Sequence, residues 1–418
     1  MLALVLVFLS QSVLQSNRME GVAFYAHWVG AKAVAVEQTA APLYTQEGRQ
    51  RVAEAGLSAA KLDGHPQLVG AAVRGANTYG PGHVTVGTPF YYRISHLLST
   101  QEYVYDVVRF QVLSNIGWLL ACVLMCSAFG ATEAVLGLVV LVCLSAYAPL
   151  AQDQAWAAQG RALVTLLGFV VAQWTATQRK HNVGSAGVLV ALTVAYHPAL
   201  VLVPMLLLIG ELAGRRRDRA KRFGAGLLAG GVLAVLIGTV GYARLGDWWA
   251  WFGTLFDDNP IDSLARGSVA LEVLSTELLG WRVPSLALPV AASAVALAVR
   301  FRAALVEPAP AVAFAVSLGA AAEILVSDRA ATHSFVLMVP TLLYLLREGA
   351  APRPQVLAVL GFGLTSSPAG TLATVFPMKL WNLLSAPHLT ALTAHVGVLL
   401  MIAALLLDLR RPASSDPG

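Results

Sequence analysis

Long runs of apolar residues, separated by short polar and basic segments, occupy most of this 418-residue chain. A membrane-spanning helix needs about 20 apolar residues, and fewer where it is bent or packed among other helices. The pattern therefore predicts an all-α integral membrane fold with about a dozen spans (11–13). The expected spans are 1–17, 107–128, 132–149, 161–177, 184–197, 198–213, 223–243, 284–299, 308–326, 331–346, 355–372 and 387–408.

The basic residues between these runs test the number of crossings. They are Arg179–Lys180, the cluster Arg215–Arg222, Arg300 with Arg302, Arg347 with Arg353, and Arg410–Arg411. If 184–213 crosses twice, with a break at Pro198, every basic loop lies on one side; a single crossing would split them. Short cytoplasmic loops carry the excess of Lys and Arg. The pattern favours two crossings and places both termini in the cytoplasm.

We expect one polytopic membrane domain over 1–418, with two long segments on the outer side and a flexible tail. The outer segments are 18–106 and 244–283, and the tail is 411–418. The first span is predicted to stay as an anchor. A cleaved signal peptide is the alternative, although the segment lacks a basic start and no small-residue cleavage site follows at Gln15–Arg18.

Composition narrows the class of protein. Hydrophobic residues make up 57% and charged residues 12%, whereas soluble domains carry about 25% charged residues. The net charge of +5 sits in loops between apolar runs, so it indicates membrane orientation and not a nucleic-acid partner. Three cysteines in apolar runs, without a CxxC pair, argue against a disulfide framework or a zinc site. We expect a multi-pass protein of the plasma (inner) membrane.

The first outer segment carries an amphipathic pattern. Phe24, Trp28, Ala31 and Ala35 recur at helical spacing, which predicts a helix lying at the membrane surface. Residues 75–89 are rich in Gly, Pro and Thr and predict turns. A second surface helix is expected near 93–101, after Tyr91 and Tyr92. These aromatic side chains suit an interfacial belt, and also contact with a sugar or an isoprenoid.

The second outer segment repeats this theme with Trp248, Trp249, Trp251 and Phe252. Its Asp257–Asp258 pair is a candidate for a divalent cation, but one acidic pair is weak support. We assign no metal site, and the sequence identifies no cofactor. The P-loop, HExxH and GxSxG patterns are all missing from the sequence.

Polar residues near the outer ends of spans are more informative, because a charge at the centre of a membrane helix costs roughly 2.5–3.5 kcal/mol. The polar residues near the outer ends are Asp153, Arg161, His197, Glu323, Asp328, Arg329 and His333. Among them, His197, Arg329 and His333 come from different spans at one expected depth. Convergence of cations at one depth is what a phosphate-bearing lipid requires.

The order of these features resembles family 87 glycosyltransferases, membrane enzymes of the superfamily C fold. That family opens with a short span, an Asp-Phe-x-x-Phe-Tyr type sequence and a small-residue helix ending in Leu-Tyr. Here Glu20, Phe24 and Tyr25 match that spacing, and Ala41–Tyr44 follows. The acidic residue is Glu where the family has Asp.

Later stretches of the chain are also similar to the family. Its Pro-aromatic stretch is matched by Thr88–Tyr92 and Tyr103–Asp106, and its late Ser-rich turn, His and Pro by Ser327–His333 and Pro340. Two departures are Arg161 after Gln159–Gly160, and His197–Pro198 where the family has Lys-Pro. The family's Asn-containing motif is missing from 244–283.

The resemblance implies transfer of one sugar, a hexose such as mannose or a pentose, from a polyprenyl-phosphate carrier. The acceptor is a lipid or glycan hydroxyl on the outer (periplasmic) face, and the transfer inverts the anomeric centre. Glu20 is implied as catalytic base, with His333, Arg329 and His197 contacting the donor phosphate. Candidate substrate contacts are His27, Tyr91, Tyr92, Asp153, Arg161, Trp248 and Trp249.

Two other functions stay open from the sequence. A transporter or lipid flippase would share the many spans, but it should show internal repeats with paired broken helices. The chain shows no such symmetry and one clear break, at Pro198. A non-catalytic relative of the family is the second alternative, because of the departures at Glu20 and Arg161.

Overall fold

The computed structural model describes residues 22–62, 87–99, 103–145, 159–177, 183–254, 271, 274–276, 280, 287–326, 332–366 and 387–410. Within these ranges all regular elements are α or 3-10 helices. Several predictions fall outside them: the first span 1–17, Glu20, Asp153, Asp257–Asp258, Arg329 and the tail 411–418.

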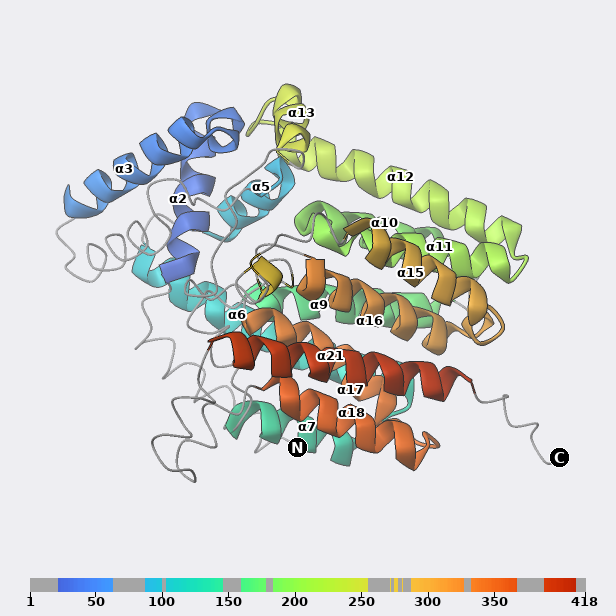
Figure 1. Ribbon diagram of the computed structural model, residues 1–418. Coiled ribbons are helices and arrows are strands. Elements are labelled where there is room, and N and C mark those ends of the chain that lie inside the picture. The colour runs from blue at the N-terminus through green and yellow to red at the C-terminus, as the bar shows by residue number, and fades with distance from the viewer. Residues whose placement is uncertain are drawn as a thin grey trace, which may run out of the picture.

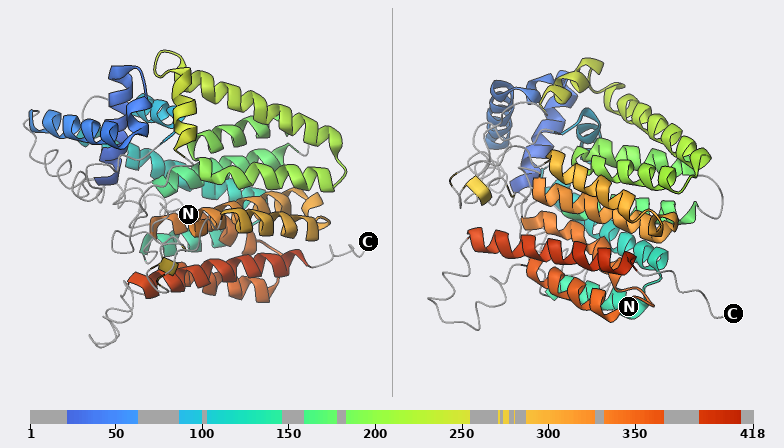
Figure 2. Two further views of the ribbon diagram at one scale, coloured as in Figure 1. Left: turned by 45° about the horizontal axis from the view of Figure 1, so that its top comes forward. Right: turned by 45° about the vertical axis from the view of Figure 1, so that its right-hand side comes forward.

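A bundle of roughly parallel and antiparallel helices makes up the body of the protein (Figures 1 and 2). Each span predicted from residue 107 onward overlaps one of its helices. They are α6 Tyr103–Phe129, α7 Glu133–Ser145, α9 Gln159–Ala176, α10 Val183–Tyr196, α11 Leu202–Ala213, α12 Arg217–Thr239, α15 Ala287–Arg300, α16 Pro308–Val326, α17 Val339–Leu345, α18 Pro352–Thr365 and α21 Pro387–Leu409.

Four of these helices, α6, α12, α16 and α21, are long and apolar enough to cross a membrane. Large apolar side chains lie on the exposed faces of α6, α12 and α21: on α12, Leu228, Val232 and Leu236 are 74%, 60% and 51% exposed at a spacing of four residues. A stripe of this kind on the outside of a bundle indicates contact with lipid, because water-facing stripes are polar. The protein is therefore a helical, membrane-associated protein.

Small residues let the bundle helices approach closely. A Cβ added to Gly226 on α12 would lie 2.0 Å from the carbonyl oxygen of Gly184 on α10. The same holds between α18 and α21, where a Cβ on Gly397 would lie 2.4 Å from the Gly361 oxygen. Close backbone packing through small residues is typical of membrane helices, which gain little by leaving lipid.

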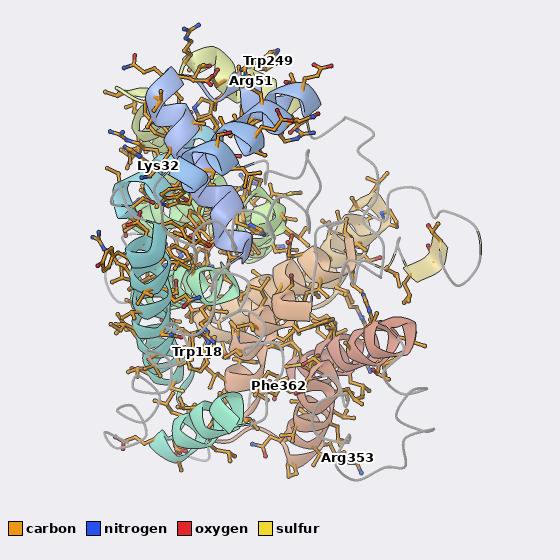
Figure 3. The ribbon with its side chains drawn as sticks, turned by 90° about the vertical axis from the view of Figure 1, so that its left-hand side faces the viewer. Lys32, Arg51, Trp118, Trp249, Arg353 and Phe362 are labelled. Carbon is orange, nitrogen blue, oxygen red and sulfur yellow. The ribbon has the colours of Figure 1, made fainter. Side chains whose placement is uncertain are left out.

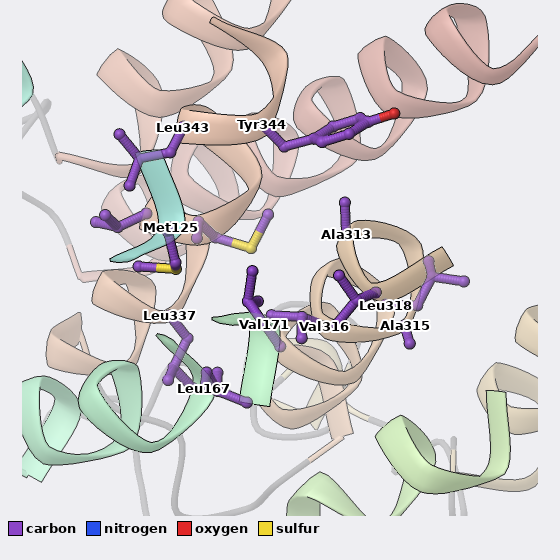
Figure 4. Packing of buried hydrophobic residues seen from close by; sticks show 14 of the residues in the cluster. Met125, Leu167, Val171, Ala313, Ala315, Val316, Leu318, Leu337, Leu343 and Tyr344 are labelled. Atoms are coloured by element: carbon purple, nitrogen blue, oxygen red, sulfur yellow. The ribbon is translucent and has the colours of Figure 1, made fainter. Parts of the chain in front are cut away.

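Side chains fill the centre of the bundle where α6, α9, α16 and α17 meet (Figure 4). Met125 of α6, Leu167 of α9 and Val316 of α16 are fully buried there. The predicted span 331–346 is not one α-helix: a 3-10 helix η5, Thr332–Met338, precedes α17. Pro340 sits in the first turn of α17, where its missing N–H costs nothing, so a new helix begins at that point.

The two ends of the bundle differ in character. One end, which we call the basic end, holds the starts of α12, α16 and α18 and the ends of α15 and α21, with the cationic loops (Figure 1). Its turns are linked by bonds from Arg216 Nη2 to the Leu305 carbonyl and from the Glu348 amide to the Gly130 carbonyl. The basic cluster predicted from the sequence therefore lies at one end, as far as it is described.

A small helical layer, which we call the cap, covers part of the opposite end (Figure 1). It consists of α2 Val22–Glu37, η1 Ala41–Tyr44, α3 Gln46–Leu62, α5 Pro89–Leu98 and α13 Leu245–Gly253. The helix expected near 93–101 starts earlier, at Pro89, because the Thr88 side chain caps it by accepting the Tyr91 amide. The cap thus joins the two long segments 18–106 and 244–283.

The stripe on α2 packs against protein and does not lie free on a membrane surface. Phe24 and Ala31 are 5% and 0% exposed, and the Phe24 ring lies 5.1 Å from Phe110 of α6. The apolar spacing predicted the helix correctly but not its partner, because a stripe facing α6 and a stripe facing lipid look alike in sequence.

Candidate functional site

The chain breaks between α10 and α11, at the cap end of the bundle. His197 is extended, and Pro198 opens the 3-10 helix η2, Pro198–Val201. Proline cannot donate the backbone hydrogen bond that would continue α10, so carbonyl groups in its last turn need other partners. Thr88 supplies one: its hydroxyl donates to the Ala195 carbonyl oxygen at 2.6 Å. The cap is thereby bonded to the break.

His197 and Glu323 form a hydrogen-bonded pair across this break. The Nε2 of His197 lies 3.0 Å from Oε1 of Glu323, near the end of α16. Because a carboxylate only accepts hydrogen bonds, Nε2 carries the hydrogen. The Glu323 side chain is 6% exposed and the His197 side chain 32%. The second carboxylate oxygen, Oε2, is buried and accepts no hydrogen bond from the part of the chain that the structure describes.

A second polar group lies between α6 and α9. Arg161, in the first turn of α9, is 2% exposed, and its Nη1 donates to Asn115 Oδ1 of α6. Asp106, Gln111 and Asn115 of α6 are also fully buried. Polar side chains buried inside an apolar bundle are costly, and in membrane helices they mark functional positions more often than elsewhere.

These groups lie at the same end of adjacent helices. Helix α9 packs against α6, α10, α16 and η5. Its first turn, the last turn of α10 and the last turn of α16 all point to the cap end (Figure 1). The first turn of η5, which contains His333, lies at that end too. We use the name cap-end cluster for the three residues at this end: Arg161 of α9, His197 directly after α10, and Glu323 of α16. The side chain of His333 is not described.

Asp106 links this end of the bundle to the cap. Its Oδ2 accepts a hydrogen bond of 2.8 Å from the indole Nε1 of Trp28 on α2. The ammonium of Lys32 lies 4.2 Å from the centre of the same indole ring. The backbone of His27 belongs to α2, but its side chain, a predicted substrate contact, is not described.

Asp247 holds the two halves of the cap together. Its carboxylate, 3% exposed, accepts hydrogen bonds from the Thr39 hydroxyl at 2.9 Å, the Ala40 amide at 2.7 Å and the Arg244 amide at 2.9 Å. Every donor comes from a helix start or its preceding turn, which leaves amides unpaired. This carboxylate is fully used by the fold.

The predicted contacts Tyr91 and Tyr92 lie in the core of the cap and not on its surface. Their exposures are 8% and 0%, and the Tyr92 hydroxyl accepts the Gly87 amide at 3.1 Å. Nearby, burial raises the pKa of Tyr44 above its ordinary range, with further contributions from Tyr92 and Asp247. These rings serve the packing of the cap, so we leave them out of the proposed site.

Trp248 and Trp249 point to different surroundings. Trp249 is 77% exposed and stacks on Phe252, with 5.7 Å between ring centres; Figure 3 shows it at the edge of the cap. Trp248 is partly buried, beside Gly238 at the end of α12. Two exposed rings stacked on each other favour the interfacial belt over a sugar contact for Trp249.

The buried ion pairs of the basic end are more completely satisfied. Glu211 on α11 is 1% exposed and lies 3.1 Å from both Arg216 and Arg219. Asp408 on α21 accepts from Arg347 at 2.7 Å. Pairs like these fasten helix ends to each other. Among the described residues, no group of three or more His, Cys, Asp or Glu side chains is placed to hold a metal ion.

Comparison of the chain with protein-family models, with characterised proteins and with solved structures finds no match. The function is therefore argued from the site alone. Sequence reasoning noted Glu323 as a charge in an apolar run but did not carry it into the site. It missed Asn115 and the role of Thr88 altogether, because neither an amide within a helix nor a cap before Pro89 indicates its partner.

Proposed function

We propose that this protein is a membrane glycosyltransferase that moves one sugar from a polyprenyl-phosphate carrier to a hydroxyl of a lipid or glycan. The observation that carries the proposal is the cap-end cluster. A buried guanidinium and an imidazole–carboxylate pair lie at the same end of the bundle, beside a folded cap. A lipid phosphate entering from the bilayer would meet cations there.

The proposal includes an orientation. With the basic end in the cytoplasm, about a dozen crossings place the cap and the cap-end cluster on the outer face of the plasma membrane. The four long apolar helices and the lipid-type stripes support a membrane setting. The shorter apolar helices would complete the crossings where they pack among longer ones.

In the proposed reaction, the acceptor hydroxyl loses its proton to a carboxylate base and attacks the anomeric carbon of the sugar. The bond from that carbon to the phosphate oxygen breaks, and the carrier phosphate leaves with the electron pair. Arg161 and His197, with His333 and Arg329, would stabilise the negative charge on the departing phosphate. Glu20 is the proposed base.

The test is sugar transfer by purified protein in lipid nanodiscs, with a panel of radiolabelled polyprenyl-phosphate sugars and an envelope-lipid extract as acceptor. Wild-type protein should release polyprenyl phosphate and label an acceptor. Glu20→Gln should lower turnover by about 10²- to 10⁴-fold with donor binding retained, because Gln cannot accept the proton. Near-normal turnover of Glu20→Gln would contradict the catalytic role. Glu20 would then be an acidic residue that only stabilises the start of a helix through the helix dipole.

A proton-coupled transporter is the second candidate, because a buried Glu–His pair at a broken helix also suits a proton pathway. It predicts solute or proton flux in sealed liposomes and no release of carrier phosphate. The glycosyltransferase predicts the opposite result in both assays.

A further inference from the structure

The imidazole ring of His197 has two edges in different surroundings. Its Nε2 edge faces the buried Glu323, 3.0 Å away, while the side chain as a whole is 32% exposed. The other nitrogen, Nδ1, makes no hydrogen bond that the structure shows in the described part of the chain. A doubly protonated ring donates through both nitrogens, so Nδ1 is available for a second anion.

Glu323 differs from the other buried carboxylates of the described residues. Asp247 accepts three hydrogen bonds, and Glu211 is held by two arginines. Among the carboxylates of the described residues, only Glu323 keeps a buried oxygen, Oε2, without a hydrogen-bond partner there. Fold-stabilising carboxylates are satisfied on both oxygens, since an unpaired buried acceptor is costly. The pair is therefore built for something other than closing the fold.

The position of the pair adds to this argument. It sits where α10 is broken, and breaks at membrane depth are tolerated where the chain lines protein or a cavity. It also lies at the same end as buried Arg161, on the neighbouring helix α9. A guanidinium and an imidazole at the same end of the bundle offer N–H donors suited to a phosphate group.

We propose that His197 and Glu323 act as one phosphate-recognition unit. Glu323 is the positioning residue: its Oε1 fixes the ring through Nε2 and balances its charge. His197 then donates through Nδ1 to a phosphate oxygen of the lipid carrier, and Oε2 remains for a donor group that the ligand brings. This inference rests on the proposed function, because the phosphate recognised is that of the carrier.

The experiment compares binding of a long-chain polyprenyl monophosphate with the polyprenol of the same length, in nanodiscs. The dissociation constant of the polyprenol divided by that of the monophosphate measures the preference for phosphate. This ratio does not depend on general changes in stability. His197→Gln should reduce this ratio by about 10- to 100-fold, the value of one charge-assisted hydrogen bond. Glu323→Gln should reduce it to a similar extent.

Three further variants sharpen the result. The double variant should lose no more than either single variant, because the two residues act as a unit. Glu323→Asp keeps the charge and should retain part of the preference; it also serves if Glu323→Gln fails to fold. Glu211→Gln, a buried carboxylate at the basic end, is the matched control and should leave the ratio unchanged.

The proposal is overturned if folded His197→Gln keeps the wild-type ratio, or if the two single losses add in full in the double variant. Competition by inorganic phosphate separates two sources of the same chemistry. Displacement of the lipid at low millimolar inorganic phosphate would mean a site for free phosphate, and overturns the lipid assignment. If the wild-type protein prefers the phosphate-bearing lipid but transfers no sugar, the His197–Glu323 recognition unit is supported and the glycosyltransferase proposal is refuted.

Discussion

The bundle and the cap are held together by different means. In the bundle, α10 and α12 touch backbone to backbone through Gly184 and Gly226. In the cap, aromatic packing and hydrogen bonds hold the helices together. The Tyr242 hydroxyl donates to the Ala31 carbonyl at 2.8 Å, and Asp247 accepts three hydrogen bonds. A helix leaving lipid gains little hydrophobic free energy, so close contact must supply the stability. Where water is the alternative, aromatic burial supplies it.

The largest effect expected from this comparison is at Gly226. Gly226→Leu places a side chain where a Cβ alone would lie 2.0 Å from the Gly184 carbonyl oxygen. The backbone of α10 cannot move aside as a flexible side chain can. We therefore expect the free energy of unfolding to fall by at least about 3 kcal/mol, with little folded protein. Thermal melting followed by size-exclusion chromatography in detergent measures it. Gly231→Leu on the same helix, with nothing within 4 Å, is the control; equal melting of the two would refute close packing.

A smaller and local effect is expected in the cap. Asp247→Asn removes the charge and puts an NH₂ group among the amide and hydroxyl donors, which should cost about 1.5–3 kcal/mol. Hydrogen exchange should speed up in 39–44 and 244–247 while α10 and α12 stay protected. Asp218→Asn, exposed at the start of α12, is the matched control. Uniform deprotection of the bundle would show that the cap and bundle are one cooperative unit, contrary to the comparison.

The smallest effect concerns pH. Burial, with Arg93 and Lys32 nearby, lowers the pKa of His96 on α5 below its ordinary value of 6.5. The folded state therefore binds fewer protons than the unfolded chain, and stability should fall slightly as pH drops below 6.5. The ring also stacks on Tyr242, with 5.4 Å between centres. His96→Gln should flatten this part of the melting-temperature profile between pH 7 and 5. An unchanged profile would assign the pH dependence to other groups.

The helices of the bundle could be predicted from sequence because a membrane run needs only length and apolar character. The break at Pro198 and the grouping of the basic loops followed from proline chemistry and charge. The prediction was less accurate for 331–346, where Pro340 starts a new helix after η5. Hydropathy alone does not distinguish a 3-10 turn from an α-helix.

The cap and the site were harder to predict, because their partners are distant in sequence. Phe24 and Trp28 were recognised as a stripe, but their contacts on α6 were not. His197 was selected for its expected depth in the membrane, whereas its bond to Glu323 depends on how α10 and α16 pack. The catalytic assignment of Glu20 stays a prediction, since that residue lies outside the described ranges.

The bond between Thr39 and Asp247 has a consequence for how the protein is made. Its two residues are 208 positions apart. At 5–20 residues per second, a ribosome needs about 10 to 40 s to travel that far. Until then α2 and η1 lack the carboxylate that pairs the Thr39 hydroxyl and the Ala40 amide, and the Ala31 carbonyl lacks the Tyr242 hydroxyl. The first cap helices are among the first parts of the described chain to be synthesised, but their hydrogen bonds wait for residues 242–247.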